Sequence, residues 1–295
     1  MPNSCFLIVD GSSLLVRAYF ATAYSGQLMQ TKSGVCTNGI HGFLHMLTGA
    51  CEIIRPSHLF IAWDVSRDTF RREIFPQYKA TRGELPVELL PQFDLAQQVL
   101  KDLGVAQYSH PRFEADDLIG SMARIAERQG HSATILTGDR DSLQLITDLV
   151  TVAITKKGIK ELEYYTPTRL HEELRIQADQ IRDLKALMGD ASDNIPGVSG
   201  IGEKTALKLL LEHGTIENLF ENLHTVKGKL REKLELHRDS AFLSKKLATI
   251  VTDIPMELDV ADCRMQFLLD QAKDRLLDLE LHRVIQQLQR LTEIA

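Results

Sequence analysis

The stretch TILTGDRDSLQLI places two aspartates, Asp139 and Asp141, just beyond an apolar run that resembles a buried strand. Alone, this pattern is ordinary, because an aspartate at a helix start accepts hydrogen bonds from free backbone N–H groups. Two other apolar runs also end in aspartate, at Asp10 and Asp64. The carboxyl ends of parallel strands lie at one edge of a sheet, where ligands bind. We therefore expect these acids to meet there.

Two further groups of acids have a spacing that places side chains on one helix face. Glu114 and Asp117 lie three positions apart with Asp116 between them, and Asp190 and Asp193 repeat that spacing. Each group by itself could be only a turn or a complement to a helix N-terminus. Convergence of all of them instead predicts a shared site of nine carboxylates: Asp10, Asp64, Glu114, Asp116, Asp117, Asp139, Asp141, Asp190 and Asp193.

Such a cluster needs compensation, because neighbouring carboxylates raise one another's pKa steeply. Hard divalent cations with oxygen ligands supply it. No His or Cys accompanies these acids, which favours Mg²⁺ or Mn²⁺ over zinc. Sites with two such ions belong to phosphatases, polymerases and nucleases. The sequence thus predicts metal-assisted phosphoryl chemistry.

Strands and helices alternate through the first half of the chain, which predicts an α/β fold with a mostly parallel sheet covered by helices on both faces. Beyond about residue 167 the pattern is helical, so we expect a metal-binding core over 1–166 and a helical region over 167–295. Strands are predicted at 5–10, 58–64, 105–108 and 133–139, a hairpin within 149–166, and helices at 12–23 (capped by Ser12 or Ser13), 39–54, 87–104 and 114–130.

The run NIPGVSGIGEKTALKLLLEHG, 194–214, has the pattern of a helix–hairpin–helix spanning about 184–213. Gly200 and Gly202 frame a tight turn, and the following helix would point free backbone N–H groups at a phosphate. Lys204 adds a positive charge beside Thr205. The alternative is that the glycines only bring two helices close together.

Residues 65–88 form a long charged connection between a predicted strand and a predicted helix. Connections of this length inside a compact domain are usually functional or mobile. Its cations, among them Arg71, Lys79 and Arg82, are interleaved with aromatic residues, a composition suited to a single nucleic-acid strand. The alternative is a solvated loop with a few packed aromatics.

Composition says more about the cellular compartment of the protein than about its activity. The chain has 295 residues, 44% of them hydrophobic, and a net charge of −6 that decides nothing, because acids that hold metal are neutralised by it. Four scattered cysteines without a C-x-x-C pair argue against a zinc site or disulfide framework and fit a reducing cytoplasm. Met1–Asn3 leads directly into a strand-like run, so we expect no signal peptide, and no apolar stretch is long enough to span a membrane.

Together these motifs resemble the bacterial 5′-nuclease family, which includes the 5′–3′ exonuclease domain of DNA polymerase I and the flap endonucleases. The resemblance extends to about residue 255 and rests on IVDGSSLLVRAYF, the WD of the second strand, F-R-x₆-YK-x-x-R, EADD, TGDRDSLQL and GDASDNIPGVSGIGEKTA. No polymerase segment follows, so the chain looks most like a stand-alone member.

The resemblance implies a structure-specific 5′ nuclease, acting as both 5′–3′ exonuclease and flap endonuclease on DNA in replication and repair. It implies one metal held mainly by Asp10, Asp64, Glu114, Asp116 and Asp117, and a second served by Asp139, Asp141, Asp190 and Asp193. The segment 65–88 resembles the family's helical arch, in which Lys79 and Arg82 match the basic pair at the scissile phosphate. The hairpin often binds K⁺ in such proteins.

The resemblance also implies the partners. We expect a monomer that binds DNA at a 5′ flap, nick or 5′ end, with an RNA primer strand as a further substrate, and no membrane. The expected DNA contacts are Arg17, Arg71, Lys79, Arg82, Gly200, Gly202, Lys204 and Thr205.

Two other classes of protein remain to be weighed. A phosphatase of the haloacid dehalogenase type needs a second aspartate two residues after the nucleophilic one, and this chain has Ser12 in that place after Asp10. A non-catalytic DNA-binding module built on the hairpin would not need nine acids. Mg²⁺-dependent cleavage of a flap substrate separates all three.

Overall fold

The computed structural model describes residues 5–23, 28–156 and 158–294. Met1–Asn3, on which the expected absence of a signal peptide rested, lies outside the described residues. Lys157, within the predicted hairpin, lies outside them too.

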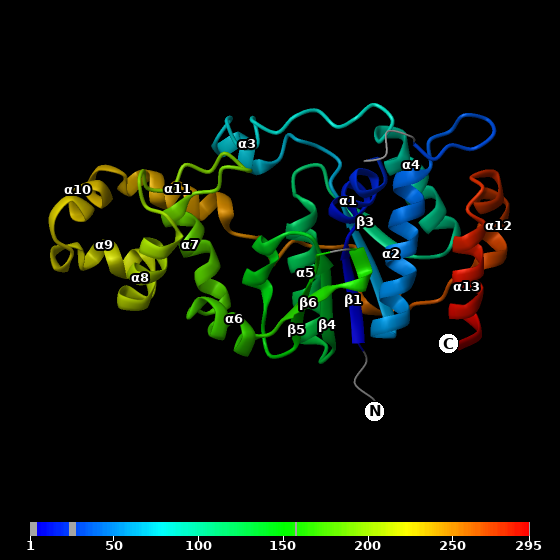
Figure 1. The fold of residues 1–295 in the computed structure, drawn as a ribbon. Helices are drawn as coiled ribbons and strands as arrows, with labels where there is room; N and C mark the ends of the chain where they lie inside the picture. Colours follow the sequence, from blue (N-terminus) through cyan, green and yellow to red (C-terminus); the bar gives the residue numbers. More distant parts are fainter. Residues whose placement is uncertain (1–4, 24–27, 157, 295) are drawn as a thin grey trace.

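A six-stranded sheet forms the centre of the N-terminal half, in the order β3-β2-β1-β4-β5-β6 (Figure 1). All neighbouring strands are parallel except β5 and β6, which form the predicted antiparallel hairpin. The predicted α/β class is confirmed. The strands are β1 Cys5–Asp10, β2 His58–Trp63, β3 Ala106–Ser109, β4 Ser132–Thr137, β5 Val150–Thr155 and β6 Leu162–Tyr165.

The strand order reverses at β1, which lies between β2 and β4. From β1 the chain first builds outward through β2 to β3, and it then returns to place β4 on the other side of β1. A reversal of this kind opens a crevice at the carboxyl ends of the two strands that flank it. Asp10 ends β1, and Asp139 follows β4 by two residues. The topology therefore directs both acids to one crevice.

Helices surround the sheet and make up the described C-terminal half, as predicted. They are α1 Gly11–Ala23, α2 Asn38–Ile54, α3 Phe70–Ile74, α4 Leu90–Asp102, α5 Ala115–Arg128, α6 Pro167–Leu174, α7 Ile181–Met188, α8 Glu203–His213, α9 Ile216–Glu221, α10 Gly228–Leu236, α11 Arg238–Ala248, α12 Leu269–Asp278 and α13 His282–Ile294.

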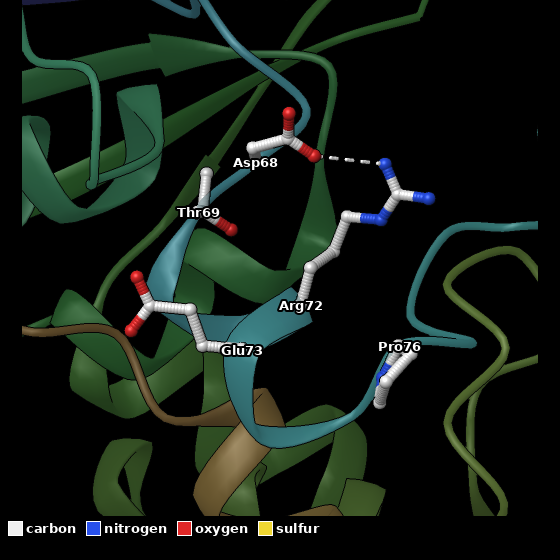
Figure 2. Close-up of a pocket in the computed structure, with 5 residues that line it drawn as sticks. All are labelled: Asp68, Thr69, Arg72, Glu73 and Pro76. Atoms are coloured by element: carbon white, nitrogen blue, oxygen red, sulfur yellow. Dashed lines mark hydrogen bonds and ion pairs between the residues drawn. The ribbon is translucent and has the colours of Figure 1, made fainter.

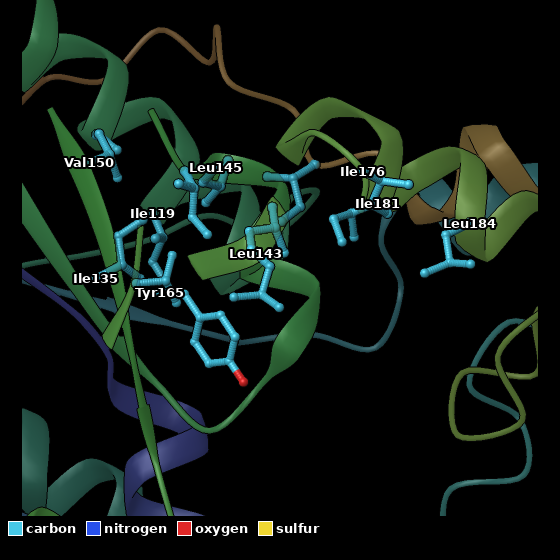
Figure 3. Packing of buried hydrophobic residues seen from close by; sticks show 14 of the residues in the cluster. Ile119, Ile135, Leu143, Leu145, Val150, Tyr165, Ile176, Ile181 and Leu184 are labelled. Atoms are coloured by element: carbon cyan, nitrogen blue, oxygen red, sulfur yellow. The ribbon is translucent and has the colours of Figure 1, made fainter. Parts of the chain in front are cut away.

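Alternate residues of each strand pack on opposite faces of the sheet. In β1, Leu7 and Val9 face α1, α2 and α4, whereas Phe6 and Ile8 face α5. The second face continues beyond the sheet through Leu143 of the short 3₁₀ helix Arg140–Leu145 into α7 and the helices after it (Figure 3). One continuous hydrophobic cluster therefore joins the sheet to the C-terminal helices and fixes their relative placement.

The last two helices, to which the sequence assigned no role, return to the N-terminal half. Helices α12 and α13 pack beside α2 and α4, on the face of the sheet away from α5 (Figure 1). Arg275 of α12 donates to Asp102 Oδ2 at 2.5 Å and to Gln98 Oε1 at 2.9 Å. The end of the described chain thus completes the core of the first half.

Residues 65–88, called the arch segment from here on, cross the top of the molecule in Figure 1. The expectation of a helical arch is met only by α3, a helix of five residues, and the rest of the segment consists of turns and extended chain. Its beginning contains a surface hollow of about 360 Å³ lined by Asp68, Thr69, Arg72, Glu73 and Pro76 (Figure 2).

Candidate active site

Asp10 lies at the carboxyl end of β1 and is held by the two segments that follow the central strands. Its Oδ1 accepts the Ser13 N–H at 2.8 Å, and its Oδ2 accepts the Thr137 hydroxyl at 2.9 Å. The prediction that Ser12 or Ser13 caps the first helix is wrong, because α1 begins at Gly11 and Asp10 itself serves its first turn. Ser12 instead accepts the Asp64 backbone N–H at its Oγ, at 2.8 Å.

Asp64 and Asp139 each accept a backbone N–H at the start of a helix and also lie at the same edge of the sheet. Asp64 Oδ1 accepts the Ala115 N–H at the start of α5 at 2.9 Å. Asp139 Oδ1 accepts the Asp141 N–H at 2.9 Å, so the ordinary capping interpretation holds for it as well. Capping and facing the other acids are compatible, because each carboxylate keeps an oxygen that its cap does not use.

Four acids from four segments lie close enough for their charges to affect the pKa values of Asp10 and Asp116. Burial, followed by the charge of Asp64, raises the pKa of Asp10 to about 7. Burial, followed by the charges of Asp139 and Asp10, raises the pKa of Asp116 well above its ordinary value. The structure therefore brings Asp10, Asp64, Asp116 and Asp139 into one electrostatic cluster.

Asp141 and Asp190 are joined by a lysine that the motifs of the sequence did not indicate. Lys185, in the last turn of α7, forms an ion pair with Asp141 Oδ1 at 2.6 Å and another with Asp190. Burial and the charge of Asp139 raise the pKa of Asp141 to about 6. Burial raises the pKa of Asp190, but the hydrogen bonds from Lys185 and Ser192 outweigh it and lower that pKa to about 2. A cation one turn before an acidic loop was the available signal.

Glu114 and Asp193 are bridged by side chains of the arch segment. The Tyr78 hydroxyl lies 3.1 Å from Glu114 Oε2 and 3.1 Å from Asp193 Oδ2. Lys79 Nζ contacts the same Glu114 oxygen at 2.8 Å, and Arg82 pairs with Asp193. Lys79 has a left-handed backbone, with φ of 56°, and its N–H donates to the Asp193 carbonyl at 2.9 Å. The arch segment is thus docked onto the acids, and Tyr78 is a second residue whose role the sequence did not reveal.

Asp117 and Arg71 occupy different places from those predicted. Asp117 is completely buried, and both its oxygens accept from the Arg71 guanidinium, at 2.6 and 2.7 Å. Arg71 itself is 2% exposed. The prediction that Arg71 contacts DNA is contradicted by its burial. The prediction that Asp117 binds metal is contradicted too, because Arg71 occupies both its oxygens.

The remaining predicted DNA contacts lie at the surface. Arg17 is exposed, and its guanidinium donates to the Thr155 carbonyl at 2.7 Å as it crosses Gly138. A Cβ on Gly138 would lie 2.5 Å from Arg17 Cδ, so a larger residue there would displace the Arg17 side chain. Gly200, with φ of 75°, turns the chain before Gly202, and Gly202 precedes the first residue of α8. Their contact with DNA stays a prediction.

Lys204 is exposed in the first turn of α8, and Thr205 is half-buried beside it. Lys233 of α10 places its Nζ 3.4 Å from the Gly200 carbonyl. Positive charge from two helices therefore gathers at this turn, a feature that the Gly-Ile-Gly pattern alone did not reveal.

The donor set fits hard divalent cations. The acids offer only carboxylate oxygens, and the bridging ammonium of Lys185 shows that Asp141 and Asp190 hold a positive charge between them. In this conformation the described residues contain no group of three or more His, Cys, Asp or Glu side chains arranged to hold a metal ion. A metal ion at Glu114, Asp141 or Asp190 would compete with Lys79 and Lys185 for the carboxylate oxygens that these lysines now contact.

Acidic side chains gathered at the carboxyl ends of parallel strands, beside a helical region, define the class of protein. A family model described as "5'-3' exonuclease, N-terminal resolvase-like domain" matches residues 5–175. A second, "5'-3' exonuclease, C-terminal SAM fold", matches residues 176–270. The chain belongs to the 5′–3′ exonuclease family.

Relatives of known name agree with this assignment. The chain is 43% identical to the 5'-3' exonuclease of Bacillus subtilis over 276 residues, which cover 94% of this chain and 93% of that one. It is 45% identical to DNA polymerase I of Bacillus caldotenax over 261 residues, covering 88% of this chain but only 29% of the polymerase. The resemblance stated from the motifs is therefore confirmed.

Solved structures show the same fold at low sequence identity. The zinc-bound T5 5'-exonuclease matches with a TM-score of 0.67 at 19% identity, covering 98% of this chain and 99% of that one. The catalytic core of Rad2 in complex with DNA substrate matches with a TM-score of 0.60 at 16% identity, covering 98% and 92%. Over the described ranges, no helix of this chain is both long and apolar enough to cross a membrane.

Proposed function

We propose that this protein is a metal-dependent, structure-specific 5′ nuclease that cleaves DNA phosphodiesters at 5′ ends, nicks and flaps. The observation that carries the proposal is the convergence of Asp10, Asp64, Asp116 and Asp139, from four separate elements, in a member of the 5′–3′ exonuclease family. Catalysis that relies on bound cations needs such a set of carboxylates, whereas a DNA-binding module does not.

The acids would hold the cations, and the arch segment would supply the charges that meet the substrate. A bound divalent cation lowers the pKa of a water and polarises a phosphate oxygen. Asp10, Asp64, Glu114, Asp116 and Asp139 would hold one ion, with Asp141, Asp190 and Asp193 serving a second directly or through water. The charge of Asp139 acts on both Asp116 and Asp141, so Asp139 lies near a member of each group.

Lys79 and Arg82 would stabilise charge that develops on the scissile phosphate. Both now pair with carboxylates, Lys79 with Glu114 and Arg82 with Asp193. A phosphate near these acids would compete with Glu114 and Asp193 for Lys79 and Arg82. Substrate binding would therefore release Glu114 and Asp193 to bind metal. Tyr78 would keep the arch segment in place while Lys79 and Arg82 exchange their carboxylate partners for the phosphate.

The turn at Gly200 and the start of α8 would hold duplex DNA, since free N–H groups at a helix start bind phosphate. Bound DNA in the structures of Rad2 and of a T5 flap endonuclease supports this partner. We further propose Mg²⁺ as the ion, with Mn²⁺ substituting, K⁺ at the hairpin, a monomeric state and a cytoplasmic location.

Cleavage of 5′-labelled flap, nicked and blunt substrates across a Mg²⁺ titration tests the proposal. We expect Mg²⁺-dependent products whose sizes place the cut near the branch of the flap and at the 5′ end of the nick. DNA binding without cleavage at any Mg²⁺ or Mn²⁺ concentration would instead favour a binding module. Release of inorganic phosphate alone would favour a phosphatase.

A further inference from the structure

Arg71 and Asp117 form a buried, bidentate ion pair near the site. The guanidinium donates two parallel hydrogen bonds to the two carboxylate oxygens, at 2.6 and 2.7 Å. Such bidentate pairs are strong and geometrically specific. Neither side chain is free to meet DNA or metal, because Arg71 is 2% exposed and Asp117 is fully buried.

The pair joins three segments that are distant in the sequence. Arg71 belongs to α3 in the arch segment and donates its other hydrogen bonds to the carbonyls of Leu247, at 2.8 Å, and Thr249, at 2.9 Å, at the end of α11. Asp117 belongs to α5 and accepts the Val251 N–H at 2.9 Å. Four hydrogen bonds from Arg71 and the bond from Val251 to Asp117 therefore tie the arch segment, α5 and the end of α11 together.

The same pair also sets the position of Glu114. Asp117 Oδ2 accepts the Glu114 backbone N–H at 3.0 Å, which closes the capping box of α5. Arg71 Nη1 lies 3.5 Å from Glu114 Oε2, the oxygen that also contacts Lys79. The backbone and the carboxylate of Glu114 are thus both held by the pair.

Helix α11 extends this connection to the proposed DNA-binding turn. Its Ser244 hydroxyl accepts the Gly197 N–H at 2.9 Å, and its Ser240 hydroxyl donates to the Gly197 carbonyl at 2.7 Å. Leu247, at the other end of α11, packs in a small buried cluster with Tyr78 of the arch segment. One helix therefore contacts the loop before Gly200 at one end and the Arg71–Asp117 pair at the other.

We propose that Arg71 and Asp117 are positioning residues that act through Glu114, holding it in place for metal and fixing the arch segment against α11. The inference rests on the proposed function and deepens it. Partners in the outer shell of a metal ligand control its orientation, and their loss typically costs about 10- to 100-fold in metal affinity or activity. Arginine is required, because lysine carries the charge but cannot form the two parallel bonds.

The test compares Arg71→Lys and Asp117→Asn with Arg275→Gln and the wild type. Arg275 also pairs with a carboxylate, that of Asp102, but it joins α12 to α4. Mn²⁺ affinity is measured by titration calorimetry on the DNA-free protein, at a temperature at least 10 °C below each variant's own melting midpoint. Single-turnover flap cleavage is then measured across a Mg²⁺ titration.

We expect Arg71→Lys and Asp117→Asn to weaken Mn²⁺ binding about tenfold or more and to raise the Mg²⁺ concentration for half-maximal cleavage by a similar factor. Arg275→Gln should lower the melting midpoint and leave both metal measurements unchanged. Hydrogen exchange of the arch segment should also accelerate in Arg71→Lys and stay unchanged in Arg275→Gln.

Metal affinity equal to wild type in folded Arg71→Lys and Asp117→Asn would overturn the inference and leave the pair with a role in stability alone. Wild-type metal affinity in Arg71→Lys alone, with weakened affinity in Asp117→Asn, would overturn the requirement for the two parallel bonds. Failure of the proposed function has a different signature, because the wild-type protein itself would then not cleave the flap at any Mg²⁺ concentration.

Discussion

Replacing Asp10 by asparagine should make the metal-free protein more stable. Burial and the charge of Asp64 raise the pKa of this carboxyl from 3.8 to about 7. A carboxyl whose pKa is raised on folding destabilises the folded state wherever it must ionise: fully above the folded pKa, and not at all below the unfolded pKa. The cost therefore grows as pH rises from about 4 to about 7.

The magnitude follows from the size of that shift. About three pKa units correspond to ~4 kcal/mol at pH 8, and the part already present at pH 5.5 corresponds to ~2 kcal/mol. Asparagine keeps an oxygen for the Ser13 N–H, and its amide meets the Thr137 hydroxyl, which can also accept. Asp10→Asn should therefore raise the free energy of unfolding by an amount of that order, and by more at pH 8 than at pH 5.5.

Urea unfolding in EDTA at the two pH values measures this difference. Asp148→Asn, which changes an exposed acid between β4 and β5, is the matched control and should change stability little at either pH. In saturating Mg²⁺ the order should reverse, because the cation neutralises the wild-type acids and the variant has lost one ligand. Asp10→Asn no more stable than wild type at pH 8, or equally stabilised at both pH values, would refute the repulsion on which the reasoning depends.

Three further predictions concern metal binding, the cleavage step and DNA binding. Mg²⁺ or Mn²⁺ at about a hundred times its dissociation constant should add ~2.7 kcal/mol to the stability of the wild type, seen as a higher melting midpoint; an unchanged midpoint at millimolar metal would contradict a shared metal site. Asp116→Ala and Asp139→Ala should abolish cleavage with the fold intact by circular dichroism, and turnover within about tenfold of wild type in both would contradict their assignment. Lys79→Ala should slow single-turnover cleavage at saturating enzyme by about 10²–10³-fold, while Lys204→Ala should keep the wild-type rate but lower the salt slope of DNA binding in Ca²⁺ by about one unit. If Lys79→Ala cleaves at the wild-type rate at saturating enzyme, the arch segment binds DNA but has no role in the cleavage step.

The acids were predictable because each one is marked locally in the sequence. Asp10 and Asp139 follow apolar runs, and parallel pairing of β1 with β4 then brings their ends to one edge. Glu114 and Asp117 were marked as a helix start by their spacing, and the capping box of α5 confirms that part of the interpretation. Local pattern and sheet topology were sufficient to identify the acidic edge.

The partners of these acids were not predictable, because they come from segments that meet only in the folded chain. Lys185 reaches Asp141 from α7, and Tyr78 reaches Asp193 from the arch segment, across separations of 44 and 115 residues. No spacing rule connects positions so far apart. The sequence therefore marked every one of these residues as polar or charged without marking which of them would pair.

Arg71 and Asp117 are a second case in which the sequence did not show which residues would pair. In the sequence, each belongs to a motif rich in charges that suggested DNA and metal, and nothing local separates them from Lys79 or Asp116. Burial decides between the two roles, and burial depends on the end of α11, which reaches them only after the C-terminal helices have packed. Composition and spacing determined the class of chemistry. Tertiary packing determined which charges remain available for it, because a charge removed from water must be satisfied by its neighbours and is then no longer free to bind a ligand.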